Sequence, residues 1–226
     1  MKKILLFTFA FIFSFLMVSC GDMSEDEFNA SGRAKAILDE SDLWMVYEDE
    51  DAGLEFKYPL NVSMEEGSDF LLTVESSPID ILEGTMGFDK ETAEINMKEL
   101  ANGEYGTDVD FPFEASKEVR KLGSVNAQEF VVLGRFEVCD VRFEKKLYFF
   151  NAGNQIVITL STPIEKLIEE SPVYFTTDEA NCGEQKIWNF DNQNMFWENI
   201  VNKKDSQTAQ DALKAFDDIA NTINVK

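Results

Sequence analysis

The sequence predicts an α+β fold, in which helices pack on the faces of an antiparallel β-sheet, and three observations lead to this prediction. Apolar and polar residues alternate over 138–150 and 155–160, with turn-forming residues between the two segments. Apolar residues recur at helical spacing over 89–102 and 208–223. The chain has 226 residues, of which 44% are hydrophobic, and this is sufficient for one domain with its own core.

The first elements of the domain are expected to be short strands followed by a helix. The expected strands are 44–47, 54–58 and 70–74. A helix is predicted over 89–102, where Asn102 and Gly103 supply a stop signal. Its apolar side consists of Ala93, Met97, Leu100 and Ala101. This part of the chain therefore contributes both strands and a covering helix.

A long hairpin is the most regular pattern in the chain, and it follows a predicted strand over 128–133. The apolar odd positions of its first strand, within 138–150, are Cys139, Val141, Phe143, Leu147 and Phe149. Lys145 interrupts the alternation and indicates either a bulge or an exposed end. Residues 151–154 have the composition of a turn, and 155–160 forms the returning strand.

Helices are expected after the hairpin. Thr162, Pro163 and Glu165 form a predicted capping box that opens a helix, and Ser171-Pro172 ends it. Farther along, the sequence predicts an irregular segment over 173–194 and helices over 195–203 and 208–223. The last helix has an apolar stripe made of Ala212, Leu213, Phe216, Ile219, Ala220 and Ile223.

The beginning of the sequence resembles a bacterial lipoprotein signal peptide. Lys2 and Lys3 precede an apolar run that is too short to span a bilayer, and Leu16-Met17-Val18-Ser19-Cys20 resembles a lipobox. The sequence therefore predicts a signal peptide over 1–19 and lipid attachment at Cys20. The alternative is cleavage by the ordinary signal peptidase, with Cys20 incidental.

The chain is therefore expected to consist of a signal peptide, a tether and a single domain. Residues 20–42 are expected to be an acidic tether, and 43–226 a single α/β domain with an insertion at about 164–205. The expected location is the bacterial cell envelope, where the protein is anchored in the membrane by lipid and faces the periplasm or the exterior.

Charge and composition exclude several functions. There are 43 acidic and 20 basic residues, for a net charge of -23, and there is no histidine. Catalytic triads, zinc sites and haem sites that depend on histidine cannot be built. A nucleic-acid partner is not expected either, because phosphate binding needs clustered Lys and Arg.

Two cysteines remain after lipidation, namely Cys139 and Cys182. In an oxidising compartment such a pair indicates a disulfide, which would tie the insertion to the sheet. The alternative is two free thiols, with Cys139 buried on the core face of its strand.

Acidic and aromatic residues supply the remaining candidate sites. Acidic clusters at 48–51, 108–110 and 191–194 are either calcium ligands or solvated loops. A pair of carboxylates could hydrolyse a glycoside without histidine, but no pair is distinguished in the sequence. The candidate partner surface in the insertion consists of Tyr174, Phe175, Trp188, Phe190 and Trp197. The alternative is that these aromatics pack the insertion onto the sheet.

The order of elements resembles the PsbP-like superfamily of α/β/α sandwiches. The residues that carry the resemblance are Phe56-Lys57-Tyr58-Pro59, the strand of Gly123 to Val132, the long hairpin, and Phe216-Asp217-Asp218-Ile219. The match covers about 54–163 and 206–224, with 164–205 as an elaboration. The resemblance implies an adaptor or assembly factor and not an enzyme, and it transfers no ligand residue, since the metal sites of relatives use histidine.

These observations together predict a lipid-anchored envelope protein that acts as a non-enzymatic binding or assembly module with a protein partner. A small-ligand or calcium-binding lipoprotein is the alternative, followed by a hydrolase that uses carboxylates alone. No cofactor, catalytic residue or metal-ligating residue is expected.

Overall fold

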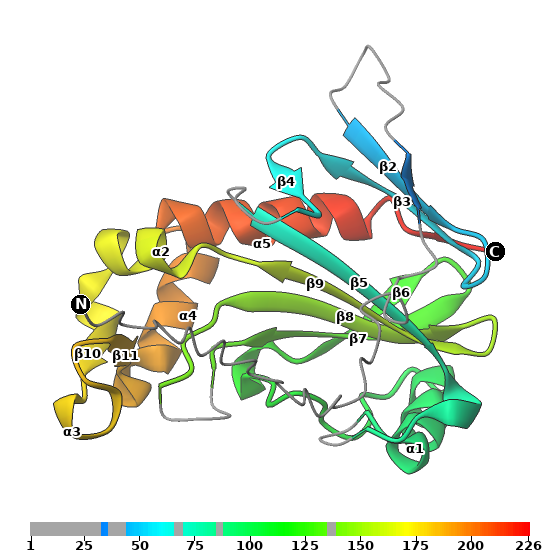
Figure 1. Ribbon diagram of the computed structural model, residues 1–226, viewed down its shortest axis with the longest axis horizontal. Helices are drawn as coiled ribbons and strands as arrows, with labels where there is room; N and C mark the ends of the chain where they lie inside the picture. The colour runs from blue at the N-terminus through cyan, green and yellow to red at the C-terminus, as the bar shows by residue number, and fades with distance from the viewer. Residues whose placement is uncertain (1–32, 36–43, 66–69, 85–87, 135–138) are drawn as a thin grey trace, which may run out of the picture.

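The computed structural model describes residues 33–35, 44–65, 70–84, 88–134 and 139–226 (Figure 1). The predicted α+β class is confirmed, because helices cover both faces of a largely antiparallel sheet. A smaller second sheet, which the sequence did not predict as a separate unit, packs beside helix α5.

The large sheet has six strands in the order β4-β5-β9-β8-β7-β6. Their bounds are β4 Val62–Ser63, β5 Phe70–Pro78, β6 Glu118–Leu122, β7 Val125–Val132, β8 Glu144–Asn151 and β9 Asn154–Ser161. All neighbours are antiparallel except β4 and β5, which are parallel. The β8–β9 hairpin is confirmed, and the positive φ angles of Ala152 (49°) and Gly153 (80°) are typical of its tight turn.

The first strand of the hairpin differs from the prediction in two ways. It begins at Glu144, so Cys139 to Phe143 lie before the strand and not within it. Lys145 is neither a bulge nor an exposed end, since it is paired in register with Val131 and is 6% exposed. The neighbouring strand β7 supplies the opposite charge, Glu129, that allows a lysine at this core-facing position.

One helix covers each face of the large sheet. Helix α1 (Lys90–Ala101) contacts β7 and β8, and its first turn is capped by Asp89, whose Oδ1 accepts the Thr92 N–H at 3.0 Å. Helix α5 (Gln207–Ala220) contacts β3, β8 and β9 on the opposite face (Figure 1). Both helices agree with the sequence prediction, although α5 ends three residues before Ile223.

The small sheet has the order β1-β2-β3-β12. Its strands are β1 Arg33–Lys35, β2 Trp44–Asp49, β3 Leu54–Pro59 and β12 Asn224–Val225. Strand β12 pairs antiparallel with β3, and the Lys226 N–H donates to the Gly53 carbonyl at 2.9 Å. Segments from opposite parts of the sequence therefore complete one sheet.

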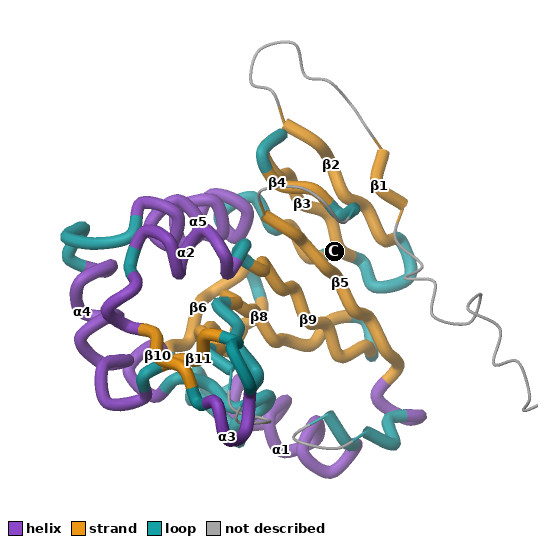
Figure 2. The backbone as a smooth tube through the Cα atoms, turned by 60° about the vertical axis from the view of Figure 1, so that its left-hand side comes forward, coloured by secondary structure: helices purple, strands orange, loops and turns teal. Residues whose placement is uncertain are grey.

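The insertion is more regular than predicted. Its elements are α2 Ile164–Glu170, β10 Phe175–Thr177, α3 Glu179–Cys182, β11 Lys186–Trp188 and α4 Gln193–Val201. Strands β10 and β11 pair antiparallel, so 173–194 is not an irregular segment. Figures 1 and 2 show these elements gathered at one end of the large sheet, away from the small sheet. Short 3-10 turns occupy Ile79–Ile81, Glu114–Ser116, Pro172–Tyr174 and Phe190–Asn192.

The predicted capping box at the start of α2 is wrong. Pro163 occupies the N-cap position and no side chain caps the helix. The Thr162 N–H donates to the Phe143 carbonyl at 3.0 Å, which fixes Thr162 at the end of the sheet, and its buried hydroxyl has no hydrogen-bond partner among the described residues.

The core lies on both sides of the large sheet. The larger part, between this sheet, α5, the insertion and β3, includes Phe56, Leu147, Phe149, Trp188, Phe196 and Phe216. The smaller part lies under α1 and consists of Leu100, Val109, Phe130, Val132, Tyr148 and Val157. Two apolar layers therefore sandwich the sheet, and the insertion shares the larger one.

Candidate functional site

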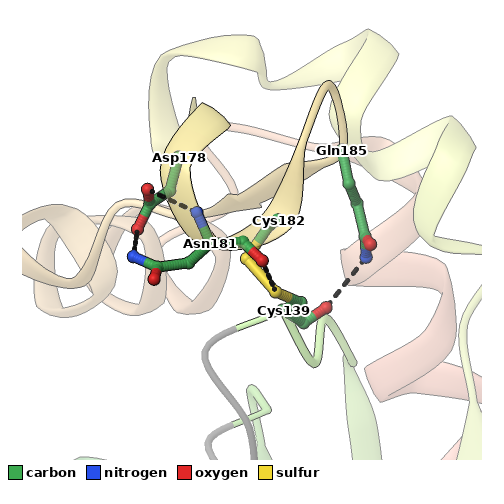
Figure 3. Close-up of a disulfide and its surroundings, with 5 residues drawn as sticks. All are labelled: Cys139, Asp178, Asn181, Cys182 and Gln185. Atoms are coloured by element: carbon green, nitrogen blue, oxygen red, sulfur yellow. Dashed lines mark hydrogen bonds between the residues drawn. A yellow bond between two sulfur atoms is a disulfide. The ribbon is translucent and has the colours of Figure 1, made fainter.

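A disulfide joins the insertion to the large sheet, as predicted. The sulfur atoms of Cys139 and Cys182 are 2.06 Å apart (Figure 3). Around it, Asp178 accepts the Asn181 N–H at 3.3 Å and so caps α3, while the Gln185 side chain donates to the Cys139 carbonyl at 2.8 Å. The bridge therefore fixes α3 and the turn after it against the segment that precedes β8.

The aromatic surface predicted in the insertion does not form as a unit. Tyr174, Phe175 and Trp188 are 2%, 7% and 1% exposed, so they pack the insertion onto the sheet. Phe175 and Trp188 face each other across β10 and β11 with ring centroids 4.4 Å apart, and the Trp188 indole N–H donates to the Arg142 carbonyl at 3.0 Å. Burial of three large rings stabilises the insertion more than an exposed position would, so these rings face the core and not a partner.

The other two predicted surface residues remain near solvent. Phe190 is 41% exposed, and Trp197 is partly buried. Trp197 lies on α4, and its ring meets that of Phe113 edge to face, with centroids 6.1 Å apart. Trp197 therefore lies where the insertion meets the edge of the sheet.

A cavity of about 690 Å³, which we name the α4–α5 cavity, lies beside Trp197. Its apolar wall is formed by Trp197, Ile200, Val201 and Leu213. Its polar wall and rim are formed by Glu118, Glu129, Lys145, Lys203, Gln207, Gln210, Asp211, Lys214, Asp217 and Asp218. Helices α4 and α5 and strands β6, β7 and β8 thus all contribute side chains to one space.

A buried ion cluster lies at the floor of this cavity. The Glu129 side chain is 1% exposed; its Oε1 lies 2.6 Å from the Lys145 ammonium, and its Oε2 accepts from Arg120 at 2.6 Å. The Lys145 side chain is 7% exposed, and its ammonium also lies 3.8 Å from Glu118. Arg120 reaches Asp217 on α5 at 2.9 Å. The cluster joins three strands and a helix through charged groups.

The carboxyl groups of Glu118 and Glu129 differ in acidity. Glu118 and Glu129 are paired in register on β6 and β7. Burial and the negative charge of Glu129 raise the pKa of Glu118 above its ordinary value. Burial alone would raise the pKa of Glu129 too, but Lys145 and Arg120 outweigh it, and this pKa is lowered.

The geometry of Glu129 does not suit a nucleophile or a general base. Each of its oxygens is held by a cation at 2.6 Å, and the side chain is almost completely buried. A carboxylate that attacks a glycoside must instead present a free oxygen to the substrate. The pair Glu118 and Glu129 therefore resembles an electrostatic anchor more than the two carboxylates of a hydrolase.

A second cavity of about 580 Å³ lies at the edge of the sheet, and we name it the edge cavity. Its lining consists of Asp108, Asp110, Phe111, Pro112, Phe113, Glu114, Leu133, Phe190, Gln193 and Asn194. Asp110 and Phe111 have φ angles of 53° and 50°, a conformation that bulky residues rarely adopt. The Asp110 carboxylate is paired with the Lys146 ammonium, which fixes the strained segment to β8.

The acidic clusters suggested as calcium ligands are largely engaged by the protein itself. Glu48 lies 3.3 Å from the Lys226 ammonium, and Asp49 accepts the Ala52 N–H at 2.9 Å. Asp108 pairs with Lys117 at 2.8 Å, and Asp110 with Lys146. Within the described ranges, no group of three or more acidic, cysteine or histidine side chains is placed to hold a metal ion.

The sequence missed Glu118, Arg120 and Glu129 as members of a site. One signal was available: Lys145 interrupts the apolar face of one predicted strand, and Glu129 lies within the neighbouring predicted strand. In the sheet Lys145 is opposite Val131 and Glu129 is opposite Leu147, so the two charged residues are diagonal neighbours on one face of adjacent strands, where opposite charges can pair. The residues that α4 and α5 contribute to the cavity have no such signal in the sequence, because their positions depend on how the two helices pack against the sheet.

The lipid-attachment residue Cys20, the signal peptide and most of the tether lie outside the described residues. Among the residues that are described, none belongs to a helix with the length and apolar character needed to cross a bilayer. Comparison with protein-family models, with curated proteins and with solved structures finds no match.

Proposed function

We propose that this chain is a lipid-anchored protein of the bacterial cell envelope that binds a partner at the α4–α5 cavity and has no catalytic activity of its own. The main support for this proposal is the Glu129–Lys145–Arg120 cluster at the floor of an accessible cavity. Removal of such ions from water is costly, and an apolar core would stabilise the fold at least as well. Charged groups placed in a cleft at this cost are a common mark of a binding site.

Two further arguments support a binding role. Trp197, Ile200, Val201 and Leu213 line the same cavity as the charged residues, and this combination suits a partner with both apolar and polar groups. The resemblance to the PsbP-like superfamily favours an adaptor or assembly factor. Because both oxygens of Glu129 are held by cations, binding is favoured over hydrolysis.

The anchoring part of the proposal is tested at Cys20. The full chain is expressed in a bacterial host with an alkyne fatty acid, and its labelling and membrane fractionation are compared with those of Cys20→Ser. The wild-type chain should be labelled and sediment with membranes, whereas Cys20→Ser should be unlabelled and extractable. Equal labelling of both chains would show that Cys20 is not the acceptor.

The binding part is tested by photo-crosslinking in the native membrane. A photoreactive residue is placed at Val201, which is 53% exposed and lines the cavity, or at Ile81, which is 67% exposed and lies in the 3-10 turn that contacts α1. A reproducible adduct at Val201 that is absent at Ile81 is the expected result. The same adducts from both positions, or none from Val201, would contradict a partner at this cavity.

A further inference from the structure

Two segments of the chain contribute residues to both the α4–α5 cavity and the edge cavity. Gln193 and Asn194, at the start of α4, line the edge cavity, while Trp197, Ile200 and Val201, farther along the same helix, line the α4–α5 cavity. A single segment also supplies Asp108 and 110–114 to the first cavity and Glu118 to the second. One helix and one strand-edge segment therefore border both spaces.

The length of this shared border suits an extended chain. Helix α4 has nine residues, and at about 1.5 Å per residue it is about 13 Å long. An extended peptide advances about 3.3 Å per residue, so about four of its residues lie alongside α4. The Phe113–Trp197 ring pair connects the linings of the two cavities, since Phe113 lines one cavity and Trp197 the other.

The charges along the border identify the chemistry of the occupant. The acidic residues that line the two cavities are Asp108, Asp110, Glu114, Glu118, Glu129, Asp211, Asp217 and Asp218. The basic residues of the lining are Lys145, Lys203 and Lys214. Three further cations, Lys117, Arg120 and Lys146, pair with the lining carboxylates Asp108, Glu114, Glu129, Asp217 and Asp110. Glu114 lies 2.6 Å from the Lys117 ammonium and Glu118 3.8 Å from that of Lys145, but their side chains are 86% and 60% exposed, so both carboxylates retain access to a partner. The excess of carboxylates favours a basic occupant and repels an acidic one.

Aromatic rings add a second reason for a basic occupant. Phe111 and Phe190 are 44% and 41% exposed at the edge cavity, and the Phe113–Trp197 pair follows. Lysine and arginine side chains bind aromatic faces through their cationic ends, and their aliphatic stems cover apolar surface. An acidic groove with aromatic rings is therefore suited to alternating basic and small residues of one extended segment.

We propose that the two cavities form one groove that holds an extended, basic segment of a partner protein, with the Phe113–Trp197 pair at its centre. This inference rests on the proposed binding function and specifies its partner. The segment enters the edge cavity past Glu114, crosses the ring pair and lies against Asp211 and Glu118 in the α4–α5 cavity.

The test uses the full lipidated chain in detergent micelles and a fluorescein-labelled peptide of eight residues in which lysine and serine alternate. Fluorescence anisotropy measures its Kd, and a peptide with glutamate in place of lysine is the control. The lysine peptide should bind and the glutamate peptide should not. If the lysine peptide does not bind, or both bind alike, the proposed basic occupant is wrong.

Matched variants distinguish binding in the groove from the non-specific attraction of a basic peptide to a chain with a net charge of -23. The groove variant is Glu114→Gln/Asp211→Asn, and the control is Glu91→Gln/Glu94→Gln on α1; all four residues are exposed. Each groove substitution alone should weaken binding about two- to fivefold, and the double variant about tenfold, while the control stays within about twofold. Equal weakening by both double variants would show non-specific attraction.

Single substitutions and the crosslinking result complete the test. If Asp211→Asn weakens binding but Glu114→Gln does not, the peptide occupies one cavity and the continuous groove is wrong. Trp197→Leu should weaken binding without changing the preference for lysine over glutamate. An adduct at Val201 together with no peptide binding would retain the proposed function and overturn only the basic segment.

Discussion

Lys145 and Glu129 are charged residues at positions that face the core of the molecule. Their ions are 2.6 Å apart, and Glu129 is also held by Arg120. Replacement of Lys145 by Met should cost about 3–5 kcal/mol of the free energy of unfolding, because one partner of a buried pair is lost. The double variant Lys145→Met/Glu129→Met should cost less than the sum of the two single variants. Urea unfolding of the full chain in detergent, followed by tryptophan fluorescence, measures all three.

Lys214 provides the control for this cycle. It also lines the α4–α5 cavity, but it is 75% exposed and pairs with Asp218 one helical turn away. Lys214→Met should change the free energy of unfolding by no more than about 0.5 kcal/mol. A Lys145→Met variant as stable as Lys214→Met would show that the buried pair contributes nothing.

Single residues differ in how far the sequence predicted them. The pairing of Cys139 with Cys182 was predictable from their number and the expected compartment. The position of Lys145 was visible as an interruption, but its partner was not, because strand register is set by the whole sheet. Thr162 was expected to cap a helix, and the end of β9 placed its hydroxyl in a buried position instead.

At the scale of elements, the disulfide is the main covalent constraint on the insertion. It closes a loop with a sequence separation of 43. By loop entropy, Cys139→Ser/Cys182→Ser should lower the free energy of unfolding by about 4 kcal/mol at most. Packing of Trp188 and Phe196 should keep β10, β11 and α4 folded. Unfolding curves of the wild-type chain and the double variant measure the loss of stability. Backbone hydrogen exchange over 178–185 should become faster in the variant, and unchanged exchange there would contradict a constraint by the disulfide.

The turn that follows β7 has a strict backbone requirement. Gly134 has a φ of 84°, and a Cβ atom at this position would lie 2.4 Å from the Asp140 carbonyl oxygen. Gly153, in the β8–β9 turn, has a φ of 80° with nothing within 4 Å of such an atom. Gly153→Ala should cost about 1–2 kcal/mol of strain, and Gly134→Ala clearly more. Melting temperatures of both variants measure the difference, and equal temperatures would refute it.

The elements that the sequence predicted are those with sufficient length for periodicity. Helices α1 and α5 and the β8–β9 hairpin each repeat their pattern several times. Strands β10, β11 and β12 have two or three residues each, and their extended conformation comes from their partners. The groove could not be predicted from the sequence, because its lining comes from segments that are distant along the chain and meet only when the elements pack together.

At the scale of the whole molecule, four carboxylates make stability depend on pH. Burial opposes ionisation of Glu129, Glu170 and Asp205, but ion pairs or hydrogen bonds prevail and lower the pKa of each. Hydrogen bonds from Thr92 lower the pKa of Asp89. The unfolded chain then binds more protons than the folded one below about pH 5, so stability is lost as the pH falls through the lowered values.

Thermal melting between pH 7 and pH 3 measures this dependence. The melting temperature should fall progressively below about pH 5. Glu170→Gln removes one contributor, because the carboxylate accepts from Thr208 and Ser206. This variant should be less stable by about 1 kcal/mol at pH 7 and approach the wild-type chain in acid. A constant difference at every pH would argue against ionisation as the cause.

The pairing of β12 with β3 has a consequence for the order of events during biosynthesis. β3 ends at Pro59, and Asn224 is the first residue of the strand that covers it. At about 5–20 residues per second, the ribosome needs roughly 10–30 seconds after β3 to synthesise the strand β12 that pairs with it. During that time β3 presents an unpaired edge, which is a template for pairing with other chains. The newly made chain is therefore most prone to aggregate before Asn224 emerges, and least prone once the small sheet has closed.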